Sequence, residues 1–414
     1  MITRLAVKNY KALRDISVSL GDFHVLVGPN GSGKSTLLDV FSFLRDCLNL
    51  DLREAVRHRG NSLDELTFGG QGGPIEFQVE FNLENELPTR RGFRVVYDLA
   101  VRSDPTLGVR VVRESLVVWP ATMDVQDHAK KTGRYKLLGK SEKDGLDQFL
   151  IEAGMFSSVG SVAVYDIPPK PDVFEFGLDN LALAKLPPDQ KRYPTACAIR
   201  ALLAKQVSLL SFIPASMARP CPALEPDEFL PDGHNLARVA GRLLNPKANG
   251  HDFDPAKAKA DWLYHLSLAL PDVSDITWAQ RPDDRAEYLR LHYRDGLTVP
   301  SWALSEGTLR MLGLMLPAFL PPKPGIHLVE EPENAVHPHA LELIVGSLRS
   351  IPQAQVLLTT HSPLVVDLVG KDPLLIFHKH DGAVQIQTAD QHAALQNRDG
   401  SPMLSALFSA GYLQ

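Results

Sequence analysis

Apolar and polar residues alternate along much of the first 120 residues, a period of two that is typical of β-strands with one buried face. The alternating segments are residues 2–7, 16–20, 75–83, 93–101 and 109–119. The first two are separated by a turn at residues 11–15. A continuous apolar run, Phe23–Val27, predicts a buried strand, and residues 35–48 after it predict a helix. The pattern therefore predicts an antiparallel sheet beside a first strand–helix unit.

Helical and strand periods continue in the rest of the chain. Residues 196–212 carry an apolar stripe at helical spacing, which predicts a helix. Further predicted helices are residues 234–244, 255–270, 307–319 and 338–350, and further predicted strands are residues 287–294, 326–330 and 355–360. Strands and helices thus alternate on both sides of a proline-rich middle, which predicts one α/β domain interrupted by an insertion.

The predicted boundaries follow this change in character. Residues 1–120 form the N-terminal part of the domain and residues 287–414 its C-terminal part. The insertion, residues 121–286, is predicted to be mostly helical with irregular proline-rich segments.

Composition narrows the class of protein. The chain has 414 residues, 44% hydrophobic and 22% charged, which are ordinary globular values. No apolar run of about 18 residues predicts a membrane span, and the N-terminus lacks signal-peptide features, so we expect a cytoplasmic protein. The three cysteines form no CxxC pair, which argues against a zinc site. A net charge of −6 disfavours a general polyanion binder, although residues 130–143 are locally basic.

The segment 28-GPNGSGKS-35 fits the P-loop pattern GxxxxGK[ST] at every fixed position, between an apolar strand and a predicted helix. Its glycines let backbone amides turn inward around phosphate oxygens. Lys34 is expected to reach the β- and γ-phosphates, and the Ser35 hydroxyl to bind Mg²⁺. The predicted phosphate-binding residues are Gly28, Pro29, Asn30, Gly31, Ser32, Gly33, Lys34, Ser35 and Thr36.

The segment 328-LVEEPENAVHP-338 places two adjacent carboxylates at the end of a buried strand. Such like charges are costly unless a cation lies opposite them. With a P-loop in the same chain, the expected cations are Mg²⁺ and Lys34. Glu330 is then predicted to hold the metal, and Glu331 to polarise the attacking water.

Three other polar segments each leave two interpretations open. Ser305 precedes a helix, so it either caps that helix or helps to grip a γ-phosphate. His361 ends an apolar strand, so it is either a core or capping residue or a γ-phosphate contact. Asn334 and His337 precede a proline-initiated helix, and both fit helix caps as well as a functional loop.

The order of these motifs resembles the ABC-class ATPases of the SMC/RecF/OLD branch, and most closely the OLD-like predicted AAA-type ATPases. The phrases that carry the resemblance are NYKALRD, LVGPNGSGKSTLLD, DGHNLARV, LSEGTLRML, VEEPENAVHPH and LLTTHSP. The resemblance implies an α/β P-loop head with a mixed sheet, flanking helices, an antiparallel β-subdomain and an α-rich insertion. It also implies ATP and Mg²⁺ as ligands.

Residue roles follow from the same resemblance. Two heads face each other head to tail, so that ATP on one P-loop is covered by the other head's signature, Ser305, Glu306, Gly307 and Thr308. Glu331 and His361 correspond to the catalytic acid and the switch histidine. Asn334 and His337 correspond to an intersubunit loop. Gln71 is the candidate for the family's metal-contacting glutamine.

Two departures from the family pattern matter. Glu330 stands where most ABC ATPases have Asp, and the longer side chain predicts slow hydrolysis. Only 53 residues follow His361, too few for the TOPRIM nuclease domain of OLD nucleases, so we expect no nuclease activity of its own.

Three functional hypotheses remain from the sequence. The first is an ATP-switched homodimer or higher homo-oligomer that regulates a separate effector, such as a nuclease or toxin in bacterial anti-phage defence. The second is a RecF- or SMC-like ATPase that binds DNA in repair or recombination, favoured by the basic residues 130–143 and disfavoured by the acidic net charge. The third, an ATPase subunit of a membrane transporter, is disfavoured by the large insertion before Ser305.

Overall fold

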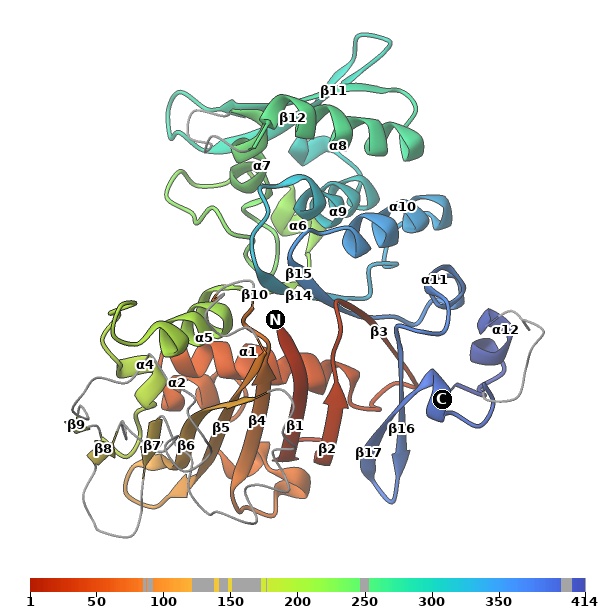
Figure 1. The fold of residues 1–414 in the computed structure, drawn as a ribbon. Helices are drawn as coiled ribbons and strands as arrows, with labels where there is room; N and C mark the ends of the chain where they lie inside the picture. Colours follow the sequence, from red (N-terminus) through yellow and green to blue (C-terminus); the bar gives the residue numbers. More distant parts are fainter. Residues whose placement is uncertain are drawn as a thin grey trace. The chain divides into compact units, whose positions relative to one another are not determined.

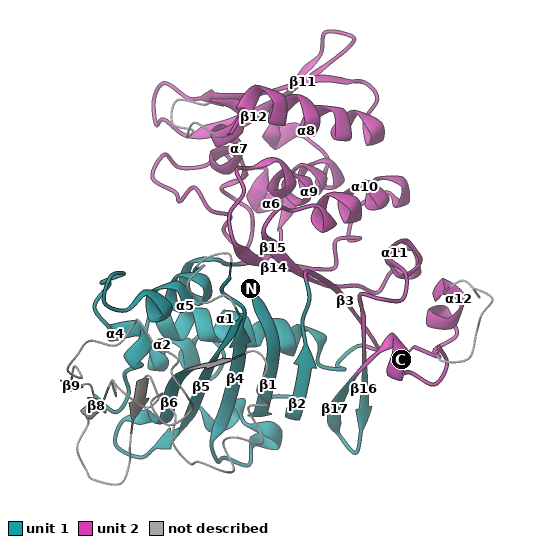
Figure 2. Ribbon diagram, viewed as in Figure 1, with its two compact units in different colours: residues 1–21, 30–207, 377–386 teal, residues 22–29, 208–376, 387–414 magenta. Residues whose placement is uncertain are grey.

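The computed structural model describes residues 1–84, 87, 92–120, 138–140, 148–150, 173–175, 177–245, 253–395 and 404–413. The chain forms two compact units, shown in Figure 2. Unit 1 contains residues 1–21, 30–207 and 377–386, and unit 2 contains residues 22–29, 208–376 and 387–414. The chain passes from unit 2 to unit 1 inside the glycine loop, after Pro29. The boundaries near residues 120 and 286 stay a prediction.

An antiparallel sheet forms most of unit 1 (Figure 1). Its order is β2-β1-β4-β5-β6-β7-β8-β9. The strands are β1 (Ile2–Tyr10), β2 (Leu13–Ser19), β4 (Ile75–Phe81), β5 (Phe93–Asp104), β6 (Gly108–Pro120), β7 (Leu138–Lys140), β8 (Gln148–Leu150) and β9 (Val173–Glu175). The first five of these confirm the alternating pattern, because the apolar positions of β1, β2 and β4 are the buried ones.

Helix α1 (Lys34–Asn49) packs on one face of this sheet. The rings of Phe43 of α1, Tyr10 of β1 and Phe77 of β4 pack together, with their centroids 5.4 to 5.5 Å apart. These are favourable aromatic separations, and all three side chains are buried. The other helical elements of unit 1 are α2 (Leu52–Arg57), η1 (Asp64–Leu66), η2 (Phe68–Gly70), α4 (Ala182–Lys185) and α5 (Pro194–Lys205).

A six-stranded sheet has the order β10-β14-β15-β3-β16-β17. Its strands are β3 (Phe23–Val27), β10 (Val207–Leu210), β14 (Gly325–Glu330), β15 (Ala354–Thr359), β16 (Leu374–His380) and β17 (Ala383–Thr388). The four central strands, β14, β15, β3 and β16, are parallel to one another. Parallel strands need crossover helices, which here include α10 (Pro338–Arg349) and α11 (Pro363–Val369). The expected α/β fold with mixed and antiparallel sheets is confirmed.

The remainder of unit 2 combines helices with a small antiparallel sheet, β11 (Val273–Gln280), β12 (Glu287–Tyr293) and β13 (Thr298–Pro300). Trp262 of α8 lies fully buried in the same core as α7 and these strands. The helical elements are α6 (Pro214–Met217), α7 (Leu236–Leu244), α8 (Pro255–Ala269), η4 (Ser301–Ala303), α9 (Glu306–Met315), η5 (Leu316–Phe319), η6 (Ala389–Gln391) and α12 (Leu404–Ser409).

The helix predicted at residues 196–212 was wrong in its second half. Helix α5 ends at Lys205, and the chain continues as strand β10, Val207–Leu210, beside β14. The apolar residues of this segment fit the period of a helix and that of a strand, so pairing with β14 decides between the two. The basic residues 130–143 lie outside the described residues, except for the backbone of β7. Within the described part of the chain, every helix is too short or too polar to span a lipid bilayer.

Candidate functional site

The glycine loop joins β3 to α1 in a conformation that glycine favours. Gly28, Gly31 and Gly33 have φ angles of 147°, 71° and 99°. Residues with a side chain rarely adopt these backbone angles. A Cβ on Gly33 would also lie 2.7 Å from a Val384 methyl carbon. The loop therefore needs glycine at these positions.

The residues around the loop fit a phosphate chain. The Ser32 hydroxyl is buried and has no hydrogen-bond partner among the described residues, so it is open to a ligand's oxygen. Lys34 and Ser35 occupy the first turn of α1, where backbone N–H groups and the helix dipole favour an anion. That turn contains no acidic residue. Pro29, Asn30 and Thr36 complete the predicted set and are partly or fully exposed.

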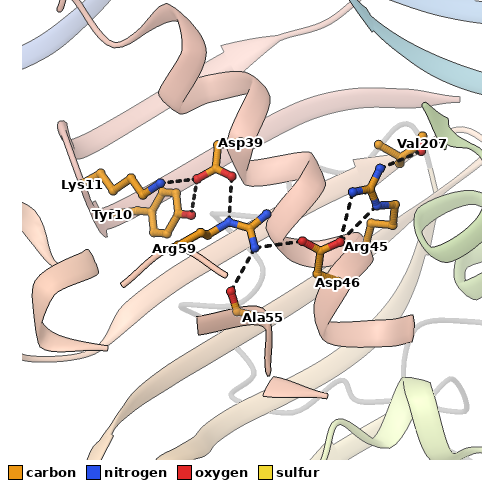
Figure 3. Close-up of polar contacts among 8 residues, drawn as sticks. All are labelled: Tyr10, Lys11, Asp39, Arg45, Asp46, Ala55, Arg59 and Val207. Atoms are coloured by element: carbon orange, nitrogen blue, oxygen red, sulfur yellow. Dashed lines mark hydrogen bonds and ion pairs between the residues drawn. The ribbon is translucent and has the colours of Figure 1, made fainter. Parts of the chain in front are cut away.

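A polar network holds the rest of α1 in unit 1 (Figure 3). Asp39 accepts hydrogen bonds from Tyr10, Lys11 and Arg59, at 2.7, 2.5 and 2.7 Å. Arg59 also pairs with Asp46, about two turns of α1 beyond Asp39, at 2.9 Å. The Arg59 side chain is only 8% exposed. One buried guanidinium thus joins two carboxylates of the helix that carries Lys34 and Ser35.

The pKa of the Asp39 carboxyl depends on two opposing effects, its burial and its cationic partners. Burial alone would raise the pKa of this carboxyl, but the charge of Arg59 and the hydrogen bond from Lys11 lower it below its ordinary value. Because the carboxylate is favoured in the folded state, its contribution to stability is present near neutral pH. That contribution is lost as the pH falls through the lowered pKa.

We expect Arg59→Met to reduce the free energy of unfolding by about 2–4 kcal/mol, because it leaves two partly buried carboxylates without their shared cation. Urea denaturation of the full chain measures the change. Arg57→Met is the matched control, since Arg57 is 69% exposed and its ion pair among the described residues is with Glu54 on the same helix. Its expected loss is about 0.5 kcal/mol or less. Equal losses in the two variants would contradict a structural role for the network.

Glu330 lies at the strand edge where β3 ends. It is paired with Thr359 of β15, and Thr359 is paired with Leu26 of β3. The strands are parallel, so their carboxyl ends share one edge of the sheet. Glu330 and Gly28, the start of the glycine loop, therefore lie at the same edge of the sheet within unit 2, with strand β15 between their strands. This arrangement is suited to a metal–phosphate ligand.

Glu331 leaves the strand in a left-handed conformation, with φ of 44°. Its amide donates to the Thr359 carbonyl at 3.0 Å. One carboxylate oxygen accepts from the Asn334 amide at 2.8 Å, and the other lies 3.9 Å from Nε2 of His361. The left-handed turn is a strained conformation for a non-glycine residue and is typical of functional positions. Three residues predicted separately from the sequence thus come together here.

Glu333 is a member of this cluster that the sequence reasoning missed. Its carboxylate accepts hydrogen bonds from the Thr360 hydroxyl at 2.9 Å and from the His361 amide at 2.6 Å. It therefore ties the loop after β14 to the end of β15 and fixes the backbone of His361. Glu333 is the third acid of the segment 328–338, but nothing in the sequence indicates that it contacts Thr360 and His361.

The N-terminus of α9 is built as a cap. The Ser305 hydroxyl accepts from the Thr308 amide at 3.2 Å and lies 2.8 Å from the Thr308 hydroxyl. Gly307 is required by packing, because a Cβ there would lie 2.5 Å from the Ala335 carbonyl oxygen. Ser305, the first helical residue Glu306, and Ala335 are all exposed. Ser305 therefore caps α9. A contact between Ser305 and a ligand stays a prediction.

Arg310 connects the same helix to the loop after the acids, and it was also missed. Its guanidinium donates to the Asn334 carbonyl at 3.0 Å and to the Phe212 carbonyl at 2.7 Å. Together with the contact between Gly307 and Ala335, this makes α9 and residues 334–336 one packed surface within unit 2. A mid-helix arginine gives no sequence signal for such a role.

The last two predicted site residues are His337 and Gln71, which lie in different halves of the chain. His337 caps α10, because its Nδ1 accepts from the His339 amide at 3.2 Å. Gln71 is exposed in the loop between η2 and β4 of unit 1. That loop is held by Asn9, whose side chain donates to the carbonyls of Gly72 and Pro74, both at 3.0 Å. Metal binding by Gln71 stays a prediction.

Two family models of known proteins match separate parts of this chain. A family model described as "AAA ATPase domain" matches residues 1–153. A second, described as "AAA domain, putative AbiEii toxin, Type IV TA system", matches residues 228–367. The first match contains the glycine loop, and the second contains the capped helix α9, the acids and His361. These matches identify the chain as an ATPase that is similar to those of the SMC/RecF/OLD branch.

Individual relatives of this ATPase are distant. The OLD nuclease of Thermus scotoductus is 40% identical over 70 residues, which are 14% of this chain and 13% of that protein. The chain thus matches only a small part of the curated relative. A crystal structure of an SMC head bound to the C-winged helix domain of ScpA has a TM-score of 0.51 and 16% identity, and covers 94% of this chain and 97% of that one. This second likeness shows the fold.

Proposed function

We propose that two copies of this ATPase bind head to tail around ATP, in the cytoplasm, and that hydrolysis separates them. The observation that carries the proposal is one exposed surface of unit 2. It joins the capped N-terminus of α9 to residues 334–337, with Gly307 packed on Ala335. A helix N-terminus open to solvent is suited to covering phosphate groups of a nucleotide bound elsewhere.

Within each copy, the chain's own residues divide the work. The loop Gly28–Thr36 binds the phosphates, with Lys34 at the β- and γ-phosphates. Ser35 and Glu330 are the residues suited to Mg²⁺, which when bound neutralises charge that develops on the phosphates. Glu331 orients the attacking water and accepts its proton, held by Asn334 and beside His361. The long Glu330 side chain supports a slow reaction.

Mixing two inactive variants tests the head-to-tail arrangement. Lys34→Ala removes the phosphate-binding lysine, and Ser305→Arg blocks the end of α9. In a mixed dimer, one site combines both defects, and the other combines an intact loop with an intact α9. We expect equimolar mixing to restore about a quarter of wild-type phosphate release, because half the dimers are mixed and each has one intact site.

The controls for mixing are the separate variants and a preparation that carries both substitutions on one chain. Each alone should be inactive, and neither single variant should rescue the double variant, because no such dimer combines an intact loop with an intact α9. Activity of Ser305→Arg alone, or the absence of any gain on mixing, would contradict a site shared between two copies.

The effector and the biological setting are a further part of the proposal. We propose that the dimer regulates a separate partner protein in bacterial anti-phage defence. The description of one matched family as a putative AbiEii toxin of a Type IV toxin–antitoxin system supports this setting. The SMC head with the related fold is bound to a partner protein, the C-winged helix domain of ScpA.

A further inference from the structure

The hairpin β16–β17 lies against the glycine loop in unit 1. Upstream, β16 runs parallel to β3, with Leu374 paired with Val25 and Ile376 paired with Val27. Strand β3 ends at Val27, where its chain turns into the glycine loop, but β16 continues to His380. The strand therefore extends beyond the end of its neighbour, and its last residues are available to the loop.

Two side chains of the hairpin approach two glycines of the loop. Val384 of β17 is buried and packs on Gly33, with its methyl carbon 2.7 Å from the place of a Cβ. The Lys379 ammonium nitrogen lies 4.0 Å from the place of a Cβ on Gly31. Gly31 is itself exposed. The hairpin thus presents an apolar side chain to the inner part of the loop and a cation to its outer part.

The charge of Lys379 is not used elsewhere in the described part of the chain. Lys379 is exposed and forms no ion pair with any described residue. Its neighbours have partners of their own: His378 lies 3.0 Å from the Gln385 side chain, and His380 lies 3.2 Å from Asp381. An unpaired ammonium group beside a loop of inward-facing amides adds a positive charge where an anion is expected.

We propose that Lys379 is a second phosphate-binding lysine, which contacts the phosphate chain of the nucleotide from the outer side of the loop at Gly31. The inference rests on the proposed binding of ATP to residues 28–36. Lys34 approaches the phosphates from the first turn of α1, and Lys379 approaches from a separate strand. The nucleotide is then held by two lysines from elements far apart in the sequence, both within unit 1.

Nucleotide titration of the full-length protein tests this assignment. Isothermal titration calorimetry with Mg-ATP compares wild type with Lys379→Ala, Lys379→Arg and Lys34→Ala. Lys191→Ala is the matched control, because Lys191 is also an exposed lysine of unit 1. We expect Lys379→Ala to weaken binding about three- to thirtyfold, as for the loss of one charge-assisted contact. The ATP affinity of Lys379→Arg should stay within about threefold of that of wild type. The ATP affinity of Lys191→Ala should equal that of wild type.

The salt dependence of the affinity separates a phosphate contact from a structural effect. Loss of a contact with phosphate should make ATP binding by Lys379→Ala less sensitive to salt than binding by wild type, with the thermal unfolding midpoint unchanged in the absence of nucleotide. Binding by Lys379→Ala within twofold of wild type, while Lys34→Ala loses binding, would overturn the role of Lys379. Wild-type binding by Lys34→Ala would instead overturn the proposed ATP site itself.

Discussion

Replacing Lys34 by alanine should lower the affinity for ATP by about 100-fold or more. The side chain lies at the N-terminus of α1 and is only 6% exposed. Its ammonium group supplies charge-assisted hydrogen bonds, each worth about 1.5–3 kcal/mol, in a place that water screens poorly. Calorimetric titration with Mg-ATP measures the loss, and phosphate release should fall to background at the same time.

The control for this variant is Lys205→Ala, which removes an exposed lysine from the last turn of α5 in the same unit. We expect its ATP affinity to match wild type. A circular dichroism spectrum identical to wild type shows that Lys34→Ala is folded. ATP binding that survives this substitution would exclude the glycine loop as the phosphate site.

Glu331→Gln should leave ATP binding intact and slow hydrolysis by about 100- to 1,000-fold, the usual contribution of a positioned general base. Glutamine keeps the shape of the side chain and a hydrogen-bond acceptor for Asn334, but it cannot accept the proton of water. Bound ATP then persists, so dimers should accumulate. Light scattering coupled to size exclusion, with Mg-ATP, measures the dimer fraction, and phosphate release measures the rate.

Glu342→Gln serves as the matched control, because Glu342 is exposed on α10. Its rate and its dimer fraction should equal those of wild type. The head-to-tail proposal fails if both wild type and Glu331→Gln remain monomeric with saturating ATP. Normal hydrolysis by Glu331→Gln would instead remove this residue from the chemical step.

The local periods predicted the elements of this fold well where a motif or a buried face fixed the pattern. Within the loop 28–35, three glycines have positive φ angles, a conformation that the glycine spacing of the motif predicts. Strands β14 and β15 read as continuous apolar runs, as parallel strands covered by helices do. The segment after Lys205 failed because its apolar residues suit a helix or a strand, and only the neighbouring β14 selects the strand.

Contacts between distant segments were beyond the sequence. Nothing local marks Arg59 as the residue that joins Asp39 to Asp46, or Arg310 as the one that binds the Asn334 carbonyl. Lys379 follows the same rule, because its charge is unremarkable until the strand that carries it runs past β3. Such roles depend on tertiary pairing, which one sequence does not encode in any short pattern.

The close approach of Gly307 to the Ala335 carbonyl has a kinetic consequence for a dimer. Ala335 follows directly on Asn334, which holds Glu331, while Gly307 belongs to the helix end that is proposed to cover the partner's nucleotide. In the proposed dimer, we therefore expect a shift of Glu331 during turnover at one site to displace the cover of the other. The resulting coupling between the ATP affinities of the two sites is reciprocal. The two ATPs of a dimer should turn over cooperatively, and the rate should rise more steeply than linearly with ATP concentration.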